Sequence, residues 1–234
     1  MPKHKQRKEK SLKINFLMNA ILTSSNFIFP LITFPYVSRI LLADGNGKIN
    51  FANSVVSYFM LIASLGLPYY GVRACAVVRD DKRKLSQTVT ELFVINVITT
   101  VCSLLLLMGA IVVIPKFQEY QYLLLILSCS IWLNTLGMEW LYQALEEYSY
   151  ITIRSIVFKA VGIVLMLLLV QQHEDYLIYA LITVISGSGS YILNFLRAFR
   201  LVSPVPLRTC NFVRHFKPIL GFFVLSAAWS LYGN

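Results

Sequence analysis

Residues 92–114 read LFVINVITTVCSLLLLMGAIVVI and contain no charged side chain. An apolar stretch of about 20 residues is long enough to cross the hydrocarbon core of a bilayer as a helix. Of the 234 residues in the chain, 57% are hydrophobic and 14% are charged, whereas soluble domains carry about 25% charged residues. The composition and this long apolar run together predict an all-α integral membrane protein.

Other apolar segments of membrane-spanning length lie on both sides of this stretch. They are residues 14–38, 49–70, 122–145, 151–170 and 176–196. A last apolar segment, residues 219–234, is shorter than the roughly 20 residues that a span needs. The sequence therefore predicts six complete transmembrane helices and a truncated seventh, with the chain expected to stop inside that seventh helix.

Basic residues are distributed unevenly between the loops. The chain has 21 Lys and Arg. Only Arg39, Lys48 and Lys116 lie on the side of the membrane opposite the N-terminus, and all the others lie on the side of the N-terminus. Because cytoplasmic loops carry the excess of Lys and Arg, this asymmetry places the N-terminus in the cytoplasm. The net charge of +10 is thus a topology signal, and we expect no nucleic-acid partner.

Local signals suggest where several helices begin and end. Thr88 and Glu91 have the spacing of a capping box for the third helix. Pro115 is expected to end that helix, and Pro218 to begin the seventh, where its missing N–H is harmless. Residues 43–47, Ala-Asp-Gly-Asn-Gly, are expected to form a turn after the first helix.

The first apolar segment is unusually polar and contains two prolines. Residues 23–26, Thr-Ser-Ser-Asn, lie near its middle and are followed by Pro30 and Pro35. Proline bends a helix, and irregular backbone at membrane depth is tolerated against protein or a water-filled cavity. Ser25 and Asn26 are therefore candidates for the lining of a substrate cavity. The alternative is that these polar side chains hold neighbouring helices together.

Glu139 and Lys159 are charged residues inside expected spans. Glu139 lies about 9 Å from one end of the fourth helix and Lys159 about 12 Å into the fifth, on the same side of the membrane. Their matched depth predicts an intramembrane ion pair. The alternative is that each side chain extends separately to the membrane surface.

The sequence contains no motif for catalysis, a metal or a cofactor. The cysteines, Cys75, Cys102, Cys129 and Cys210, are far apart and lack metal-ligand spacing. Residues 186–190, Ser-Gly-Ser-Gly-Ser, lack the flanking elements of a phosphate-binding loop and are better explained by close helix packing. We therefore expect a protein that is not an enzyme.

Four stretches resemble a known family of transporters. Residues 26–42, NFIFPLITFPYVSRILL, are similar to the first helix of Wzx-type O-antigen and capsular polysaccharide flippases. Residues 47–73 resemble the second helix of these proteins, residues 79–96 their first large cytoplasmic loop, and residues 139–155 a Glu-Trp-x-x-Gln and Tyr-Ile-Thr-Ile-Arg region. The resemblance covers essentially the whole chain, in order.

The resemblance implies a two-lobe fold of the MATE-like exporter superfamily. Residues 1–13 would be a basic cytoplasmic N-terminus, 14–198 a six-helix amino-terminal lobe, 199–218 a basic cytoplasmic loop, and 219–234 the truncated seventh helix. A family pattern in that helix matches Ser230-Leu231-Tyr232.

The implied function is movement of undecaprenyl-diphosphate-linked oligosaccharide across the cytoplasmic membrane by alternating access. Cationic side chains of the cavity would face the diphosphate, and Arg39 and Arg73 are the candidates in this chain. The implied partners are the lipid-linked oligosaccharide, the bilayer and the polysaccharide polymerase machinery. The alternatives are a multidrug or cation antiporter of the same superfamily and a non-transporting membrane subunit.

Overall fold

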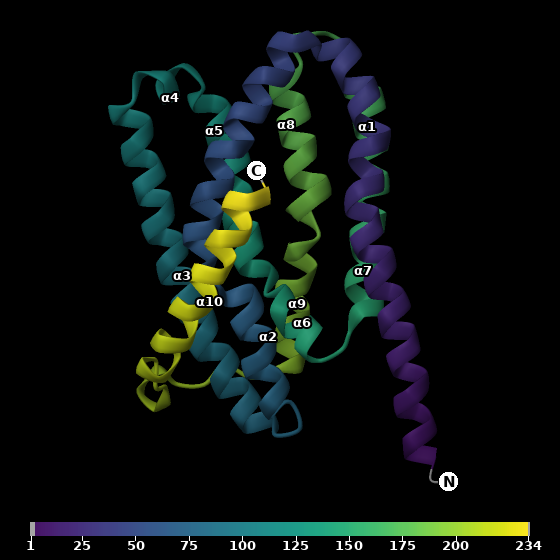
Figure 1. Cartoon of the computed structure of the whole chain (residues 1–234), viewed down its shortest axis with the longest axis vertical. Helices are drawn as coiled ribbons and strands as arrows, with labels where there is room; N and C mark the ends of the chain where they lie inside the picture. Colours follow the sequence, from purple (N-terminus) through teal and green to yellow (C-terminus); the bar gives the residue numbers. More distant parts are fainter. Residues whose placement is uncertain (1–2, 234) are drawn as a thin grey trace.

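The computed structural model describes the backbone of residues 3–233 and the side chains of residues 13–228. Every regular element in this part of the chain is a helix, and the helices stand roughly along one axis as a bundle (Figure 1). The all-α prediction is therefore confirmed for the described residues. The observed breaks within and between helices differ from several of the expected ones.

Helix α1 (Lys3–Ser64) contains the first two expected spans and reverses direction at Leu42. Leu42 has φ 56° and ψ −171°, and the chain turns over there at the top of Figure 1. The expected turn at residues 43–47 is wrong, because helical structure resumes directly after Leu42. Asn46 donates to the carbonyl of Leu42 at 2.7 Å, and Lys48 pairs with Asp44 one turn away, which stabilises this start of the descending limb.

The second expected span, 49–70, is interrupted. Helix α1 ends at Ser64, and Leu65 and Gly66 both have positive φ before α2 (Leu67–Val78) begins. Gly66 is required here, since a Cβ at this position would lie 2.5 Å from the backbone nitrogen of Phe223 in α10. The break is therefore set by the close approach of another helix.

Helix α3 (Lys82–Val113) begins earlier than the sequence suggested. The carboxylate of Asp81 accepts hydrogen bonds from the backbone nitrogens of Arg83 and Lys84 at 3.0 and 3.1 Å, which makes Asp81 the N-cap. The expected capping box of Thr88 and Glu91 is wrong, because both residues are buried inside the helix. The end of the helix just before Pro115 is confirmed.

The fourth and fifth expected spans correspond to several elements. Short α4 (Pro115–Glu119) precedes α5 (Gln121–Gly137), which is separated from α6 (Glu139–Ala144) by Met138 at φ 39°. Helix α7 (Tyr148–Leu169) follows. The break at Met138 redirects the chain, so Glu139 opens a new helix.

The sixth expected span contains a wider turn. Helix α8 (Tyr176–Val184) passes through the π-helical segment η1 (Ile185–Gly189) into α9 (Tyr191–Leu201). Segment η1 packs against α7, where a Cβ on Gly162 would collide with the side chain of Ser186. The small residues of 186–190 therefore lie at a close helix contact, as expected.

The last helix, α10 (Val213–Gly233), follows the short 3-10 segment η2 (Leu207–Thr209). Pro218 does not begin this helix, contrary to expectation, but lies within its second turn. Its missing N–H therefore leaves the carbonyl of Arg214 without its usual helical donor. The side chains of Ser230-Leu231-Tyr232 lie outside the described residues.

Five stretches of the described chain are long and apolar enough to cross a membrane. They are Lys13–Val78, Lys82–Val113, Gln121–Ala144, Tyr148–Leu169 and Tyr176–Leu201. The first contains the reversal at Leu42, so it holds both of the first two expected spans. The chain is a multi-pass membrane protein.

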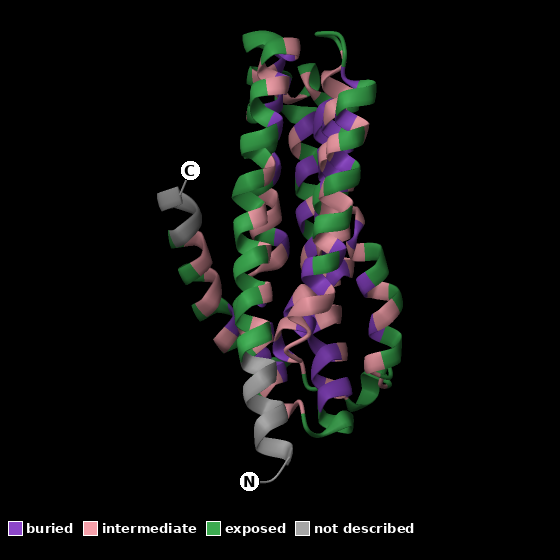
Figure 2. Cartoon of the chain, turned by 90° about the vertical axis from the view of Figure 1, so that its right-hand side faces the viewer, coloured by how far each residue is buried: buried purple, intermediate pink, exposed green. Residues whose placement is uncertain are grey.

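Buried residues concentrate between the helices, whereas the outward faces are exposed (Figure 2). Many exposed side chains are large and apolar, among them Phe27, Leu31, Leu105 and Val112. A water-facing surface of this kind would be unfavourable, but these side chains suit contact with lipid. The outer surface thus agrees with the apolar spans.

Candidate functional site

A groove of about 440 Å³ lies between the ascending limb of α1 and the middle of α7. Most of its lining is aliphatic or aromatic, including Ile28, Phe29, Ile32 and Ile163. Two kinds of polar group enter it: the hydroxyls of Ser24 and Ser25 from α1, and the ammonium of Lys159 from α7.

Lys159 joins the two walls of this groove. Its Nζ donates to Oγ of Ser25 at 2.7 Å and to Oδ1 of Asn26 at 2.5 Å. Lys159 lies eleven residues after the start of α7 at Tyr148, a depth of about 16 Å by helical rise. The Cα of Lys159 therefore lies near the midpoint of α7, which has 22 residues.

No carboxylate lies within ion-pair distance of Lys159 among the described side chains. An ammonium has three N–H donors, and the two partners on α1 are neutral. The groove therefore holds a cation whose hydrogen-bond partners are neutral, while the Glu139 carboxylate acts on it electrostatically from beyond ion-pair distance. Such a group at membrane depth is unfavourable without an anionic or aqueous partner.

The sequence of α1 explains why this wall is polar. Pro30 has no N–H for the carbonyl of Asn26, so the helical hydrogen-bond ladder is broken beside the Lys159 contact. The hydroxyl of Ser25 donates to the carbonyl of Leu22 at 2.7 Å and is thus oriented to accept from Lys159. The structure therefore brings Ser25 and Asn26 together with Lys159.

Glu139 has a different partner from the one expected. Its carboxylate lies 3.7 Å from Nη2 of Arg154 and accepts a 3.1 Å hydrogen bond from the hydroxyl of Tyr191. No ion pair joins Glu139 to Lys159 in the part of the chain with described side chains. The break at Met138 directs Glu139 to Arg154 and Tyr191, and its carboxylate acts on Lys159 electrostatically from beyond ion-pair distance, so their pairing stays a prediction.

Arg154 is a buried cation that sequence reasoning did not identify. Its side chain is 4% exposed, its Nη1 donates to the carbonyl of Ser190 at 3.3 Å, and its guanidinium lies 5.2 Å from the ring centre of Tyr191. It therefore connects α7 to α6 and α9. Its charge inside the fifth expected span, residues 151–170, was the available signal.

Arg39 and Arg73 are both exposed and lie apart from the groove. Arg39 precedes the reversal at Leu42, whereas Arg73 lies on α2, at the other end of the bundle (Figure 1). Neither forms a hydrogen bond or an ion pair with another described side chain. The structure thus does not bring these two candidates together.

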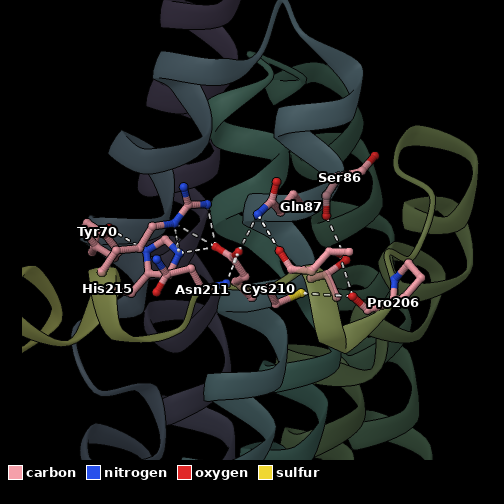
Figure 3. Close-up of polar contacts among 11 residues, drawn as sticks. Tyr70, Ser86, Gln87, Pro206, Cys210, Asn211 and His215 are labelled. Carbon is pink, nitrogen blue, oxygen red and sulfur yellow. Dashed lines mark hydrogen bonds and ion pairs between the residues drawn. The ribbon is translucent and has the colours of Figure 1, made fainter.

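A second polar cluster is centred on Glu91 and connects α3 to α10. Figure 3 shows the side chains around it, with Gln87 on one side and His215 on the other. Glu91 is fully buried, and its Oε2 accepts from Nη2 of Arg214 at 2.6 Å and from Nε2 of His215 at 2.7 Å. Because an ionised carboxylate only accepts, Nε2 of His215 carries a proton. The other ring nitrogen of His215 lies 2.7 Å from the hydroxyl of Tyr70 on α2.

The other oxygen of Glu91 holds the loop before α10. Its Oε1 accepts from the backbone nitrogen of Asn211 at 2.8 Å and from Gln87 at 3.0 Å, and Gln87 also donates to the carbonyl of Thr209 (Figure 3). Every lone-pair direction of the carboxylate is thus used by a donor. This cluster is a structural clamp, and its residues are far apart in the sequence.

A polar pocket of about 360 Å³ lies where the lower part of α1 meets α2 and α6. Nη1 of Arg79 donates to Oε1 of Glu146 at 2.5 Å across its wall. This hydrogen bond raises the pKa of the Arg79 guanidinium above its ordinary value. Asn19 and Gln143 also line the pocket. Sequence reasoning did not identify this site, because its walls come from three separate segments.

The described residues contain no group of His, Cys, Asp and Glu side chains that could hold a metal ion. The two membrane-depth sites instead present a lysine with neutral partners and an arginine paired with glutamate.

Comparison with known proteins places the chain among membrane proteins of polysaccharide synthesis. It is 23% identical over 226 residues to a putative O-antigen transporter of Escherichia coli (strain K12), covering 96% of this chain and 54% of that protein. A putative O-antigen transporter of Shigella dysenteriae is 26% identical over 227 residues, covering 94% and 56% respectively. The chain thus spans about half the length of these relatives. No solved structure matches it.

The family comparison agrees with the transmembrane architecture. Residues 12–234 match the family model described as polysaccharide biosynthesis protein. The match therefore includes every spanning stretch, the Lys159 groove, the Glu91 cluster and the polar pocket. The chain belongs to this polysaccharide biosynthesis protein family.

Proposed function

We propose that the chain is part of a flippase for undecaprenyl-diphosphate-linked oligosaccharide, used in the synthesis of O-antigen, capsule or exopolysaccharide. In this proposal, the groove between α1 and α7 receives the lipid-linked substrate, and Lys159 binds its diphosphate. The single observation that carries the proposal is the ammonium of Lys159, which lies near the middle of α7 in an apolar groove and has neutral hydrogen-bond partners.

The groove has the two properties that a lipid diphosphate requires. Its aliphatic and aromatic lining, including Ile28, Phe29 and Ile32, can accommodate an isoprenoid chain. Its only strongly charged lining group is a cation, Lys159, whose charge a diphosphate would neutralise in a low-dielectric environment. The printed names of the relatives, putative O-antigen transporters, favour the same class of substrate.

The charge distribution supports a cytoplasmic N-terminus in the cytoplasmic membrane. Residues 14–198 would then form the amino-terminal lobe, with 199–218 as a cytoplasmic loop and 219–234 leading toward a second lobe. Under alternating access, a substrate bound at mid-membrane would be exposed first to one side and then to the other as two lobes rock. Arg73 at the inner end and Arg39 at the outer end would attract the diphosphate as it enters and leaves.

The cation antiporter alternative has less support. It requires an acidic side chain in the spans that is free to bind a cation. Glu91 and Glu139 instead contact Arg214 and Arg154, respectively. Among the described residues that line the central groove, the charged one is the cation Lys159, which disfavours a cationic substrate.

The proposal is tested by binding of undecaprenyl diphosphate to the purified 234-residue chain, measured by native mass spectrometry from detergent micelles. We expect Lys159→Met to weaken binding about tenfold, equivalent to about 1.4 kcal/mol, because a charge-assisted contact is lost. Lys159→Arg should retain most of the affinity. The matched control is Lys116→Met, which removes an exposed cation in α4, at one end of the bundle (Figure 1). Equal affinities of wild type and Lys159→Met would refute the role of the groove.

A genetic experiment tests the transport function separately. Loss of the gene should abolish surface polysaccharide and leave lipid-linked oligosaccharide in the inner leaflet. Normal surface polysaccharide in the deletion strain would contradict the proposal.

A further inference from the structure

The polar pocket between α1, α2 and α6 differs in chemistry from the Lys159 groove. Its charged lining residues, Arg79 and Glu146, form a pair, so their charges cancel. The rest of its polar lining consists of neutral groups, including the side-chain amides of Asn19 and Gln143. The pocket is therefore suited to a neutral, strongly hydrogen-bonding ligand rather than to an ion.

Hydrogen-bonding capacity in the pocket remains available for such a ligand. Neither Asn19 nor Gln143 forms a side-chain hydrogen bond with another residue in the part of the chain with described side chains. Each amide offers both donors and an acceptor, and the Arg79 guanidinium has further N–H groups beyond the one used by Glu146. Sugar hydroxyls both donate and accept, so they match this mixed set. The rings of Phe16 and Tyr148 can pack against the apolar face of a sugar.

Glu146 adopts a backbone conformation that glycine would favour. It follows α6 with φ 59°. Its N–H bonds to the carbonyl of Gln143 at 3.1 Å, and the N–H of Glu147 bonds to that of Tyr142 at 2.9 Å. This is the hydrogen-bond pattern of a Schellman motif, in which glycine usually occupies the left-handed position. A glutamate there strains the backbone, and in exchange its carboxylate faces Arg79 in the pocket.

We infer that this pocket binds the saccharide part of the lipid-linked substrate, with Glu146, Arg79, Asn19 and Gln143 as its hydrogen-bonding residues. The inference rests on the proposed function, which supplies a substrate with a sugar on a lipid diphosphate. It adds a second binding site, for a neutral polyhydroxylated group, to the anion site at Lys159.

The two sites lie in the order that this substrate requires. Asn19 and Asn26 are seven residues apart on α1, so they share a face of the helix at a separation of about 10 Å along its axis. From the end of the bundle with α2 and α6, a ligand along α1 meets the polar pocket, then Lys159, then the apolar upper groove. In the proposed orientation this places the sugar nearest the cytoplasm, the diphosphate deeper, and the isoprenoid chain in the apolar groove.

The experiment compares two probes on the purified 234-residue chain by native mass spectrometry. One is undecaprenyl diphosphate, and the other is the same lipid carrying one N-acetylglucosamine residue. We expect Glu146→Gln to weaken binding of the sugar-bearing lipid about tenfold and Asn19→Ala about fivefold, as befits hydrogen bonds to a charged and a neutral group. Neither substitution should change the affinity for the bare diphosphate. Glu174→Gln, an exposed carboxylate outside the pocket, is the matched control.

The outcomes separate this inference from the proposed function. If Glu146→Gln and Asn19→Ala both bind the sugar-bearing lipid like wild type, the saccharide site is wrong, whatever Lys159→Met does. If the two substitutions weaken the binding of both lipids equally, the pocket binds diphosphate and the assignment to sugar is overturned. If they weaken the binding of the sugar-bearing lipid alone, and Lys159→Met changes the affinity for neither lipid, the saccharide pocket is supported and the anion site is wrong. Asn19 is an exposed residue of α1, so its variant should fold even if Glu146→Gln does not.

Discussion

The fully buried carboxylate of Glu91 in α3 lies 2.7 Å from Nε2 of His215 in α10. These residues are 124 positions apart in the sequence, and their contact attaches the start of α10 to the first half of the bundle. Because Oε1 of the same carboxylate also accepts from the backbone of Asn211, one side chain orients both the helix and the loop before it. The direction in which the chain leaves the bundle therefore depends on Glu91.

We predict that Glu91→Ala destabilises the protein strongly. The change leaves the buried ring of His215 without its acceptor and removes the partner of Arg214, and leaving a buried donor unpaired costs about 1–3 kcal/mol. The measurement is the thermal melting temperature in detergent. The control, Glu174→Ala, changes an exposed carboxylate and should stay within about 0.5 kcal/mol of wild type. Similar melting temperatures for the two variants would show that the cluster does not clamp α10.

The membrane spans could be predicted from the sequence because apolar length is a local property. The breaks inside them could not. Leu42, Leu65 and Met138 adopt positive φ although none is a usual turn residue. At Gly66 the backbone of α10 approaches closely. This contact joins segments that are distant in the sequence, so no local pattern could predict it. The N-cap at Asp81 lies eleven residues before the apolar stretch that begins at Leu92. The helix therefore extends beyond the apolar segment by which its start was predicted.

The candidate site was predictable in part. The polar stretch of α1 was visible, and the structure places Ser25 and Asn26 in contact with Lys159. Their meeting depends on α1 and α7 packing side by side, which no local pattern encodes. Glu139 and Lys159 are similar in expected depth and opposite in charge, but after the break at Met138 the carboxylate of Glu139 lies within ion-pair distance of Arg154.

The close contact between α7 and η1 leads to a second prediction. Gly162→Ala should destabilise the protein by about 1–3 kcal/mol, because the new methyl group would overlap the side chain of Ser186. The double variant with Ser186→Gly should recover much of this loss, since it removes the atom that is hit. Gly109→Ala is the control, because nothing lies near its added Cβ. A loss that Ser186→Gly leaves unchanged would place the clash elsewhere. Melting temperatures in detergent decide between these results.

The reversal at Leu42 leads to a third prediction, of increased stability. Its φ of 56° with ψ of −171° is a combination that is essentially confined to glycine. Relief of strain of about 1–3 kcal/mol should exceed the extra backbone entropy of glycine, about 0.5–1 kcal/mol, so Leu42→Gly should raise the melting temperature. Leu42→Ala keeps the strained backbone and should not raise the melting temperature. If glycine and alanine variants melt alike, the turn is not strained at this residue.

The last prediction concerns the proposed orientation and uses the native Cys210. This thiol is partly exposed in the loop before α10, whereas Cys75 is buried and Cys102 and Cys129 lie within spans. In right-side-out vesicles, a membrane-impermeant maleimide should leave Cys210 unlabelled until the membrane is permeabilised. Glu174→Cys, made in a Cys210→Ser background, should be labelled at once because residue 174 lies at the other end of the bundle.

The rate of this labelling should also depend on pH in a defined direction. Desolvation, with a smaller contribution from Glu91, raises the pKa of the Cys210 thiol above its ordinary value. Because the thiolate is the reacting species, Cys210 in permeabilised vesicles should react more slowly at pH 7 than the cysteine of a short unstructured peptide with blocked termini, and faster as the pH rises. Prompt labelling of Cys210 in sealed right-side-out vesicles would reverse the proposed topology, and with it the cytoplasmic placement of the saccharide pocket.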